Sequence, residues 1–246
     1  MKTTGNTILM TGGTSGIGLE LARRFRDLGN TVVISGRRKD LLDRIAAEDG
    51  IAGIPLDVAD PASIQAAFDQ VTAAYDVNVL ITMAGIMRME DLRDPAHLPT
   101  VEQTIDINLL GTIRTITAFT PYLLRQTDPA ILTVSSGLAS VPLTITPTYS
   151  ATKAAIHSYT QSLRIQLADT AVQVIEIVPP EVRTDLLRKG GTDTAMPLDE
   201  YIAETMTLLA QQPDAEEILV DRVKFLRHAE RENRYAATLA AVNQQH

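Results

Sequence analysis

Short apolar runs alternate with amphipathic helical stretches along most of the chain. Between the runs, apolar residues recur every three or four positions, the spacing of a helix that buries one face. Strands separated by helices pair in parallel through right-handed crossovers. We therefore expect an α/β fold, a doubly wound parallel sheet of six or seven strands with helices on both faces. The apolar runs fall at 6–10, 31–35, 51–58, 77–82, 130–134 and 171–178.

The chain is expected to form a single domain over residues 1–246. At 246 residues and 26.7 kDa it can bury a full core, and no Pro/Ser/Gly-rich linker or block of charge divides it. The stretch 186–213, which begins polar and glycine-containing, is interpreted as a lid over a ligand site, and 214–246 as C-terminal helices. Helices are predicted over 98–126, 148–168, 199–211, 214–229 and 231–242.

The first apolar run ends in a glycine-rich turn, Thr11 to Gly18, and a helical stripe follows it. Glycines permit a tight turn and a close approach of backbone to a pyrophosphate, which the N–H groups and dipole of a helix N-terminus attract. The spacing G-x-x-x-G-x-G differs from the common G-x-G-x-x-G fingerprint. A purely structural turn is the alternative, but the flanking strand and helix favour dinucleotide binding. The candidate residues are Gly12, Thr14, Ser15, Gly16, Ile17 and Gly18.

The second apolar run leads into Arg37, Arg38 and Lys39, with no acid at its end. An acid at this point binds the ribose hydroxyls of NAD, whereas arginine accommodates the additional phosphate of NADP. Cations at a helix start also oppose the dipole unless they meet a phosphate. A solvated basic corner is the alternative. We expect Arg37 and Arg38 to make NADP(H) the preferred cofactor, while NAD(H) could also bind.

Three further positions follow expected strands or interrupt an expected helix. Asp57 is a candidate acceptor for an adenine amine, or simply a turn-forming acid. The small residues Ala84 and Gly85 would let backbone pass close to a cofactor. Asn108 is a poor helix former inside an expected helix, which indicates either a specific partner or a kink near Gly111.

The stretch from Ser136 to Lys153 carries candidate acid–base chemistry. If residues 148–168 form a helix, Tyr149 and Lys153 lie one turn apart on the same face. The ammonium would then lower the pKa of the phenol toward neutrality, as a general acid or base requires. Ser136 could donate to the same carbonyl oxygen. Taken alone, Tyr-x-x-x-Lys is better explained as an ordinary surface pair, and only a cofactor site in the first hundred residues favours the catalytic interpretation.

Seven motifs occur in a fixed order and together closely resemble the short-chain dehydrogenase/reductase (SDR) family. The segments 135–149 and 178–180 are similar to its DltE-like branch. The resemblance covers residues 6 to about 185 and implies a Rossmann-like fold, a small-molecule substrate and a homodimer or homotetramer. The motifs are Thr11-Gly12-x-x-x-Gly16-Ile17-Gly18, Asp57-Val58, Ala84-Gly85, Asn108, Ser136, Tyr149-x-x-x-Lys153 and Pro179-x-x-Val182-x-Thr184.

The resemblance also implies roles for individual residues. Tyr149 would be the catalytic acid/base, and Lys153 would lower its pKa and hold the nicotinamide ribose. Ser136 would orient the substrate carbonyl; it is preferred to Ser135 because the family's serine stands thirteen residues before the tyrosine. Asn108 would hold a water that links Lys153 to solvent. Further matched positions at the cofactor are Val58, Ala84, Gly85, Pro179, Val182 and Thr184.

Three positions depart from the family pattern. Thr82-Met83 stands where the family has Asn-Asn, so hydrogen bonds that tie this strand to its neighbour are expected to be missing. Pro180 replaces a glycine, which stiffens the turn and removes a donor. No Val-Asp-Gly-Gly follows Val220-Asp221, which leaves the seventh strand and the tetramer open.

The leading hypothesis is an oxidoreductase that passes hydride between NADP(H) and a ketone, aldehyde or secondary alcohol. The alternative is a catalytically silent NAD(P)-binding regulatory protein on the same fold. An epimerase or dehydratase would be expected to carry a longer substrate domain. The apolar character of the candidate pocket suggests a hydrophobic carbonyl compound, although methionines also fill cores. The candidate substrate contacts are Met87, Leu138, Val141 and Leu186.

Composition narrows the partners. A net charge of −8 and a pI near 5.0 disfavour nucleic acid. The chain has no cysteine, no signal-like start and no apolar run of membrane-spanning length, so we expect no membrane association and a cytoplasmic enzyme. Its four histidines have no ligand spacing, so no metal is expected.

Overall fold

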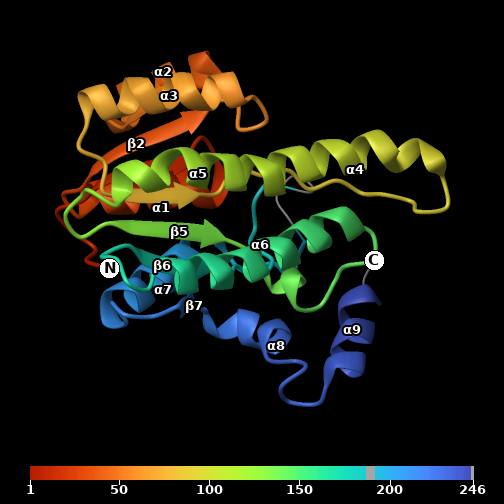
Figure 1. Cartoon of the computed structure of the whole chain (residues 1–246). Helices are drawn as coiled ribbons and strands as arrows, with labels where there is room; N and C mark the ends of the chain where they lie inside the picture. The colour runs from red at the N-terminus through yellow and green to blue at the C-terminus, as the bar shows by residue number, and fades with distance from the viewer. Residues whose placement is uncertain (187–191, 245–246) are drawn as a thin grey trace.

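The computed structural model describes residues 1–186 and 192–244 and shows a single-domain α/β fold (Figure 1). The strands are β1 (Thr7–Thr11), β2 (Thr31–Gly36), β3 (Ala52–Pro55), β4 (Val79–Thr82), β5 (Ala130–Val134), β6 (Gln173–Ile177) and β7 (Glu217–Ile218). The α-helices are α1 (Gly16–Asp27), α2 (Lys39–Asp49), α3 (Pro61–Ala74), α4 (Leu98–Ile105), α5 (Gly111–Leu123), α6 (Pro147–Gln166), α7 (Leu198–Gln211), α8 (Lys224–Arg227) and α9 (Tyr235–Asn243).

The strands of the described residues form one parallel sheet in the order β3-β2-β1-β4-β5-β6-β7. The order reverses between β1 and β4, where Thr11 pairs with Thr82. Open α/β sheets bind ligands in the crevice beyond the carboxyl ends of the strands at such a reversal. The fold therefore predicts a ligand site where Gly12 and Met83 leave the sheet.

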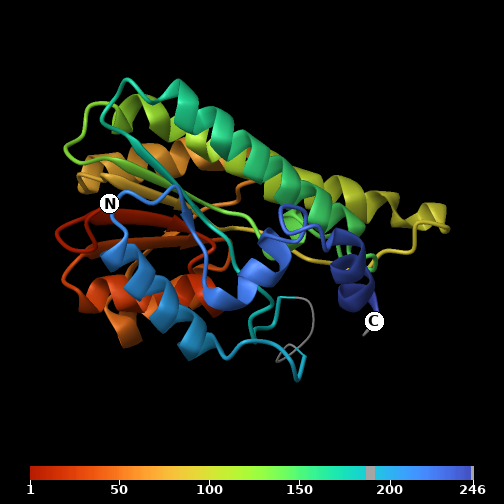
Figure 2. The same cartoon turned by 90° about the horizontal axis from the view of Figure 1, so that it is seen from below.

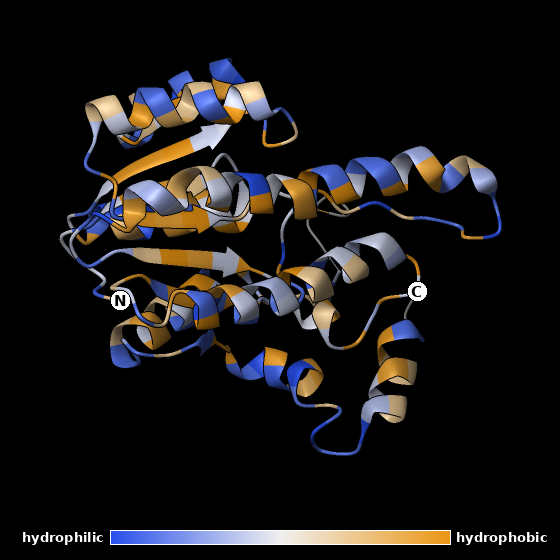
Figure 3. Ribbon diagram, in the orientation of Figure 1, coloured by the Kyte–Doolittle hydropathy of each residue, from blue (hydrophilic) through white to orange (hydrophobic). Residues whose placement is uncertain are grey.

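The central strands contribute alternate side chains to two separate cores, one on each face of the sheet. Ile8 and Met10 pack with α1, α2 and α7, whereas Leu9 packs with α3, α5 and α6. A parallel sheet covered on both faces needs such continuous apolar strands, which Figure 3 shows in orange. Burial of one large aliphatic side chain stabilises the fold by about 1.5–3 kcal/mol, so the two cores hold the crevice rigidly in place.

Local signals explain where several helices begin and end. Asp60 accepts a hydrogen bond from Ala62 N at the start of α3, and Pro61 occupies the first turn. Gly50 ends α2 with a φ of 66°, a conformation that glycine adopts without steric cost. No helix among the described residues is both long and apolar enough to cross a bilayer.

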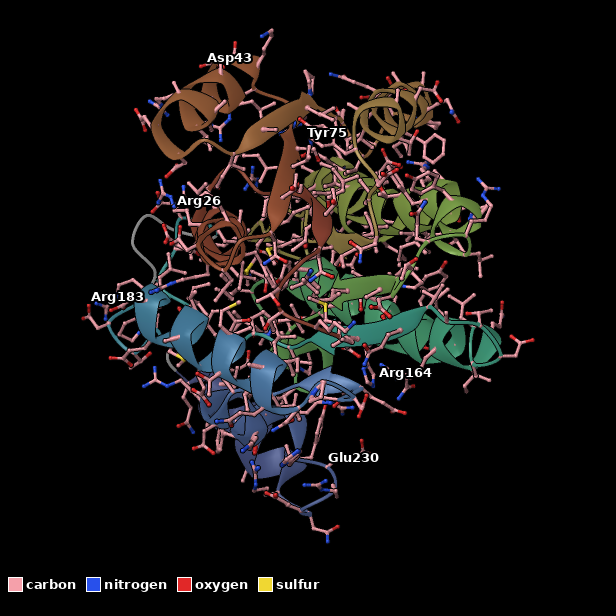
Figure 4. All side chains as sticks on the ribbon, turned by 90° about the vertical axis from the view of Figure 1, so that its left-hand side faces the viewer. Arg26, Asp43, Tyr75, Arg164, Arg183 and Glu230 are labelled. Atoms are coloured by element: carbon pink, nitrogen blue, oxygen red, sulfur yellow. The ribbon has the colours of Figure 1, made fainter. Side chains whose placement is uncertain are left out.

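Two expectations about elements need correction. The helix predicted over 214–229 is wrong in its first half, because Glu217–Ile218 form β7 and pair with Glu176–Ile177; only Lys224–Arg227 is α-helical. The edge is reinforced by Arg164, labelled in Figure 4, which donates to the Val174 and Glu216 carbonyls.

The helix predicted over 98–126 is interrupted. Residues Asp106–Leu110 form a π-helical segment between α4 and α5, and this segment contains Asn108. π-bulges of this kind occur often at functional sites.

Candidate active site

Tyr149 and Lys153 lie on the same face of α6, and both side chains are buried. The ammonium nitrogen of Lys153 is 5.6 Å from the centre of the phenol ring. It donates a 2.7 Å hydrogen bond to the Val134 carbonyl at the end of β5. The predicted pairing of phenol and ammonium is therefore present, and β5 holds the ammonium in place.

The pKa values of this pair differ from the expectation. Burial raises the pKa of Tyr149 to about 12, and an interaction with the Ser136 hydroxyl lowers it only in part. Burial lowers the pKa of Lys153 to about 8, and the Glu176 carboxylate raises it in part. The expected lowering of the phenol pKa toward neutrality is thus wrong for the protein alone, because desolvation outweighs the Ser136 hydrogen bond.

The two serines after β5 have different surroundings. Ser136 caps the short helix Gly137–Ala139 by accepting a hydrogen bond from Leu138 N. Its hydroxyl also interacts with the Tyr149 phenol by a hydrogen bond that lowers the pKa of the phenol. The Ser135 hydroxyl is buried and has no hydrogen-bond partner among the described residues. Both serines line the cavity, but only the Ser136 hydroxyl interacts with the Tyr149 phenol, which supports the choice made from sequence.

Asn108 uses its amide group to fix the backbone at Ile86. Its oxygen accepts from Ile86 N at 2.8 Å, and its nitrogen donates to Ile86 O at 2.9 Å and to Thr152 Oγ1 at 3.4 Å. Thr152 also donates to the Tyr149 carbonyl. Asn108 therefore links the loop after β4 to the helix that carries Tyr149, and the specific partner expected from sequence is this backbone.

Glu90 caps the N-terminus of α6, a role that the sequence did not indicate. One of its carboxylate oxygens accepts from Thr148 N and the other from Thr148 Oγ1, at the N-terminus of α6. An acid at this end of a helix satisfies unpaired N–H groups and complements the dipole. Because Glu90 lies far from α6 in sequence, no local capping motif could have indicated it.

The glycine turn forms a shallow cradle before α1. Gly12 has a φ of 70° and Gly16 a φ of 51°. A Cβ at Gly12 would lie 2.8 Å from Ala84 Cα, so the two loops can touch only because Gly12 has no side chain. Ser15 precedes α1 without a side-chain capping bond, which leaves N–H groups of the first turn free for an anion.

The loop after β4 is held to β1 by Thr11. Its hydroxyl oxygen accepts from Met83 N at 3.1 Å and from Ala84 N at 3.2 Å. The Thr11 hydroxyl therefore ties this loop to β1 although Asn-Asn is absent.

The basic residues after β2 lie at the far end of the same crevice. Arg37 and Arg38 are exposed, line the cavity with Thr14 and Ser15, and form no ion pair with any described residue. Lys39 instead pairs with Asp43 and does not line the cavity.

Asp57 and Val58 line the middle of the crevice. One Asp57 oxygen accepts from Ala59 N, so this acid does form a turn.

The segment after β6 covers the glycine turn. Thr184 lies against Gly16, where an added Cβ would be 3.3 Å from Thr184 Cγ2. Val182 pairs in parallel with Met196, and Pro179 O accepts from Gly137 N. The expected lid includes residues 187–191, which lie outside the described residues.

One continuous cavity of about 1090 Å³ joins the glycine turn, the basic residues after β2 and the Tyr149–Lys153 pair, whereas Asn108 does not line it. From the described residues it is lined by every predicted cofactor-contacting residue, by Ser136, Tyr149 and Lys153, and by Met87, Leu138 and Leu186. Val141 differs from the expectation: it has no exposed surface and does not line the cavity, whereas Leu143 does.

The C-terminal helices complete the apolar end of the cavity, which sequence reasoning missed. Phe225 and Leu226 come from α8, and Ala241 and Val242 from α9. Figures 1 and 2 both place α9 beside the start of α6, where Asn243 donates to Pro142 O. Nothing in the local pattern of 224–243 indicates this contact, because it depends on the path of the whole chain.

The residues present fit a nicotinamide dinucleotide. The cradle at Gly12 and the uncapped start of α1 suit a pyrophosphate, and the unpaired arginines suit a further phosphate. At the other end, the cavity reaches a phenol, an ammonium and a hydroxyl that can act on one oxygen.

The profile of the family described as short chain dehydrogenase matches residues 6–195. The chain therefore belongs to the short-chain dehydrogenase family, the class that its fold and site define, and it is an oxidoreductase of that family.

Among the relatives, an uncharacterized oxidoreductase DltE from Bacillus subtilis (strain 168) is 39% identical over 239 residues, which cover 94% of each chain. A short chain dehydrogenase from Burkholderia cenocepacia J2315 in complex with NADP has a TM-score of 0.85 at 25% identity and covers 97% of this chain and 99% of its own. A 3-ketoacyl-(acyl-carrier-protein) reductase from Brucella melitensis complexed with NADH has a TM-score of 0.75 at 25% identity, covering 87% and 93%. Structural neighbours thus bind NADP in one case and NADH in another.

Proposed function

We propose that the protein is a carbonyl reductase that uses NADPH to reduce an apolar ketone or aldehyde, and that it can run in reverse on the secondary alcohol. The observation that carries this proposal is the convergence of Ser136, Tyr149 and Lys153 on the inner end of a cavity whose outer end is a dinucleotide cradle. The cofactor, when bound, supplies the hydride.

Tyr149 is the proton donor in this scheme. Because its pKa is about 12, the phenol stays protonated at neutral pH, the form that donates to a carbonyl oxygen as negative charge develops there. The Lys153 ammonium then stabilises the phenolate that remains. Ser136 donates a second hydrogen bond to the same oxygen and fixes its position.

Preference for NADPH rests on Arg37 and Arg38. Both guanidinium groups line the cavity without an ionic partner among the described residues. Two fixed cations at this end suit the phosphate that distinguishes NADPH from NADH.

The substrate end is apolar. Met87, Leu143 and Tyr149 form a small buried cluster against which Leu138, Ile145 and Val242 pack. Such a lining favours a hydrophobic carbonyl compound over a highly charged one.

The test follows consumption of NADPH and NADH with a panel of ketones and aldehydes, for the wild type and Tyr149→Phe. Loss of a positioned general acid is expected to reduce kcat by about 10²- to 10⁴-fold, with NADPH affinity nearly unchanged. Tyr159→Phe is the matched control, since Tyr159 lies on the same helix outside the cavity. NADPH binding without turnover on any carbonyl would instead favour a catalytically silent binding protein.

A further inference from the structure

A buried carboxylate lies under the helix that carries Tyr149 and Lys153. Glu176 is the fourth residue of β6 and is 1% exposed. It points to the same face of the sheet as Val174, the face that α6 covers. Carboxylates are rarely buried so completely without a specific positive partner.

Only one of the two carboxylate oxygens of Glu176 has a hydrogen-bond partner among the described residues. Its Oε2 lies 2.8 Å from His157 Nδ1, on α6. Its Oε1 is buried and has no hydrogen-bond partner among the described residues. The burial of this carboxyl group therefore requires an explanation beyond the contact with His157.

A metal site is the first alternative, because His157, Glu176 and Glu217 bring ligand atoms within 4.8 Å of one another. Arg227 argues against it. Its guanidinium donates to both oxygens of Glu217, at 3.1 and 2.6 Å, and lies 3.2 Å from His157 Nε2. An arginine already supplies the positive charge there, so we assign no metal to this cluster.

Besides Arg227, Lys153 is a second cationic side chain near Glu176. It lies one helical turn before His157 on α6, so both side chains descend toward the same part of the sheet. Its nitrogen bonds Val134 O, and the β5–β6 register pairs Thr133 with Glu176 and Val134 with Ile177. The end of the lysine side chain thus lies over the strand pair that contains Glu176.

We propose that Glu176 is the positioning residue of Lys153: its buried negative charge keeps the ammonium protonated beside Tyr149. This inference rests on the proposed function for its catalytic meaning, but its electrostatic part does not need turnover. Among the described residues, the ionisable groups that interact with Lys153 are Tyr149 from α6 and Glu176 from β6, and His157 from α6 contacts Glu176. Behind these, Glu217 from β7 and Arg227 from α8 neutralise one another.

The direction of the effect follows from the charges. Burial alone favours the neutral amine, and the Glu176 charge opposes this. Only the protonated form can stabilise a phenolate, so activity is lost as pH rises through the Lys153 titration. Without Glu176 that loss begins at lower pH.

The test is Glu176→Gln, read by ¹³C NMR of labelled lysine side chains in the protein without cofactor. The Lys153 signal is assigned by its disappearance in Lys153→Met. The Lys153 midpoint should fall by about one pH unit or more in Glu176→Gln, the size expected for loss of a nearby opposite charge. Glu216→Gln, which removes an exposed carboxylate at the start of β7, should leave it unchanged.

The pH profile of kcat is the second readout, which a merely structural role would not move. The high-pH loss of activity should shift downward with the NMR midpoint in Glu176→Gln and return toward the wild-type position in Glu176→Asp. If the single variant does not fold, Glu176→Gln/His157→Gln changes both members of this hydrogen-bonded pair, and the Lys153 midpoint should again lie below the wild-type value.

The outcomes separate the two proposals. An unchanged Lys153 midpoint overturns the role of Glu176, whether or not the enzyme reduces carbonyls. A lowered midpoint in a wild type that reduces no carbonyl supports the counter-charge and counts against the proposed function.

Discussion

Burial acts in opposite directions on Tyr149 and Lys153 but favours the neutral form of each. The pKa of Tyr149 is raised to about 12, and that of Lys153 is lowered to about 8. Near pH 7 the phenol is therefore protonated and most of the lysine is charged. This is the pair of states that a proton donor and its stabilising cation need for carbonyl reduction.

At the other end of the crevice, the double variant Arg37→Ser/Arg38→Ser tests cofactor choice. Loss of two charge-assisted contacts is expected to weaken NADPH binding by about 10- to 100-fold and to leave NADH binding within about twofold. Fluorescence titration of both cofactors measures the ratio. Lys39→Ser removes a neighbouring cation that already pairs with Asp43, and it should change neither affinity. Equal weakening of both cofactors in the double variant would argue against phosphate recognition.

Among the elements, the loops after β1 and β4 are connected more closely than their sequences suggested. Thr11 accepts from two successive N–H groups of the β4 loop, and Asn108 fixes the next part of that loop through Ile86. Both contacts use side chains distant in sequence from the backbone they hold. A comparison of motifs detects that Asn-Asn is absent, but it does not detect the hydrogen bonds that Thr11 and Asn108 make to this loop.

Thr11→Val tests how much the hydrogen bonds between Thr11 and the loop after β4 stabilise the fold. The substitution keeps the shape of the side chain but leaves two partly buried N–H groups without their acceptor, so we expect a loss of about 1–3 kcal/mol in the free energy of unfolding. Urea denaturation measures the change. Thr7→Val, at the start of the same strand, removes a hydroxyl that makes no hydrogen bond to a described residue and should cost much less. Similar losses in both variants would contradict the assigned role of Thr11.

At the scale of the whole molecule, the sequence predicted the sheet, the glycine turn that lines the crevice and the pairing of Tyr149 with Lys153, because each is marked by residues close together in the chain. Tyr149 and Lys153 are one helical turn apart, and the glycine turn is continuous. β7 has only two residues and forms through pairing with β6, so its local pattern was taken for a helix. Likewise, Phe225 and Val242 reach the cavity only through the path of the C-terminal segment.

The buried ammonium also makes global stability depend on pH. Below pH 8 Lys153 is protonated in both states, and the cost of burying its charge is fully present. Between about pH 8 and 10.5 the folded protein releases this proton while the unfolded chain retains it, so stability rises with pH in this window.

Relative to Lys153→Met, the wild-type free energy of unfolding should therefore increase by on the order of 3 kcal/mol across this window. Urea denaturation at several pH values measures the difference between the two proteins, which removes the contribution of groups common to both. A constant difference would show that Lys153 titrates alike in the folded and unfolded states.

The central claim is that a buried phenol delivers the proton while hydride reaches the carbonyl carbon in the same cavity. The most direct measurement uses NADPH deuterated at the transferable position of nicotinamide C4 with a ketone that the enzyme reduces, and mass spectrometry of the alcohol formed. We predict deuterium on the carbinol carbon with the wild type, and a rate of labelling at least about 100-fold lower with Tyr149→Phe under saturating cofactor. Labelling by Tyr149→Phe at the wild-type rate, or alcohol without deuterium from the wild type, would contradict the account.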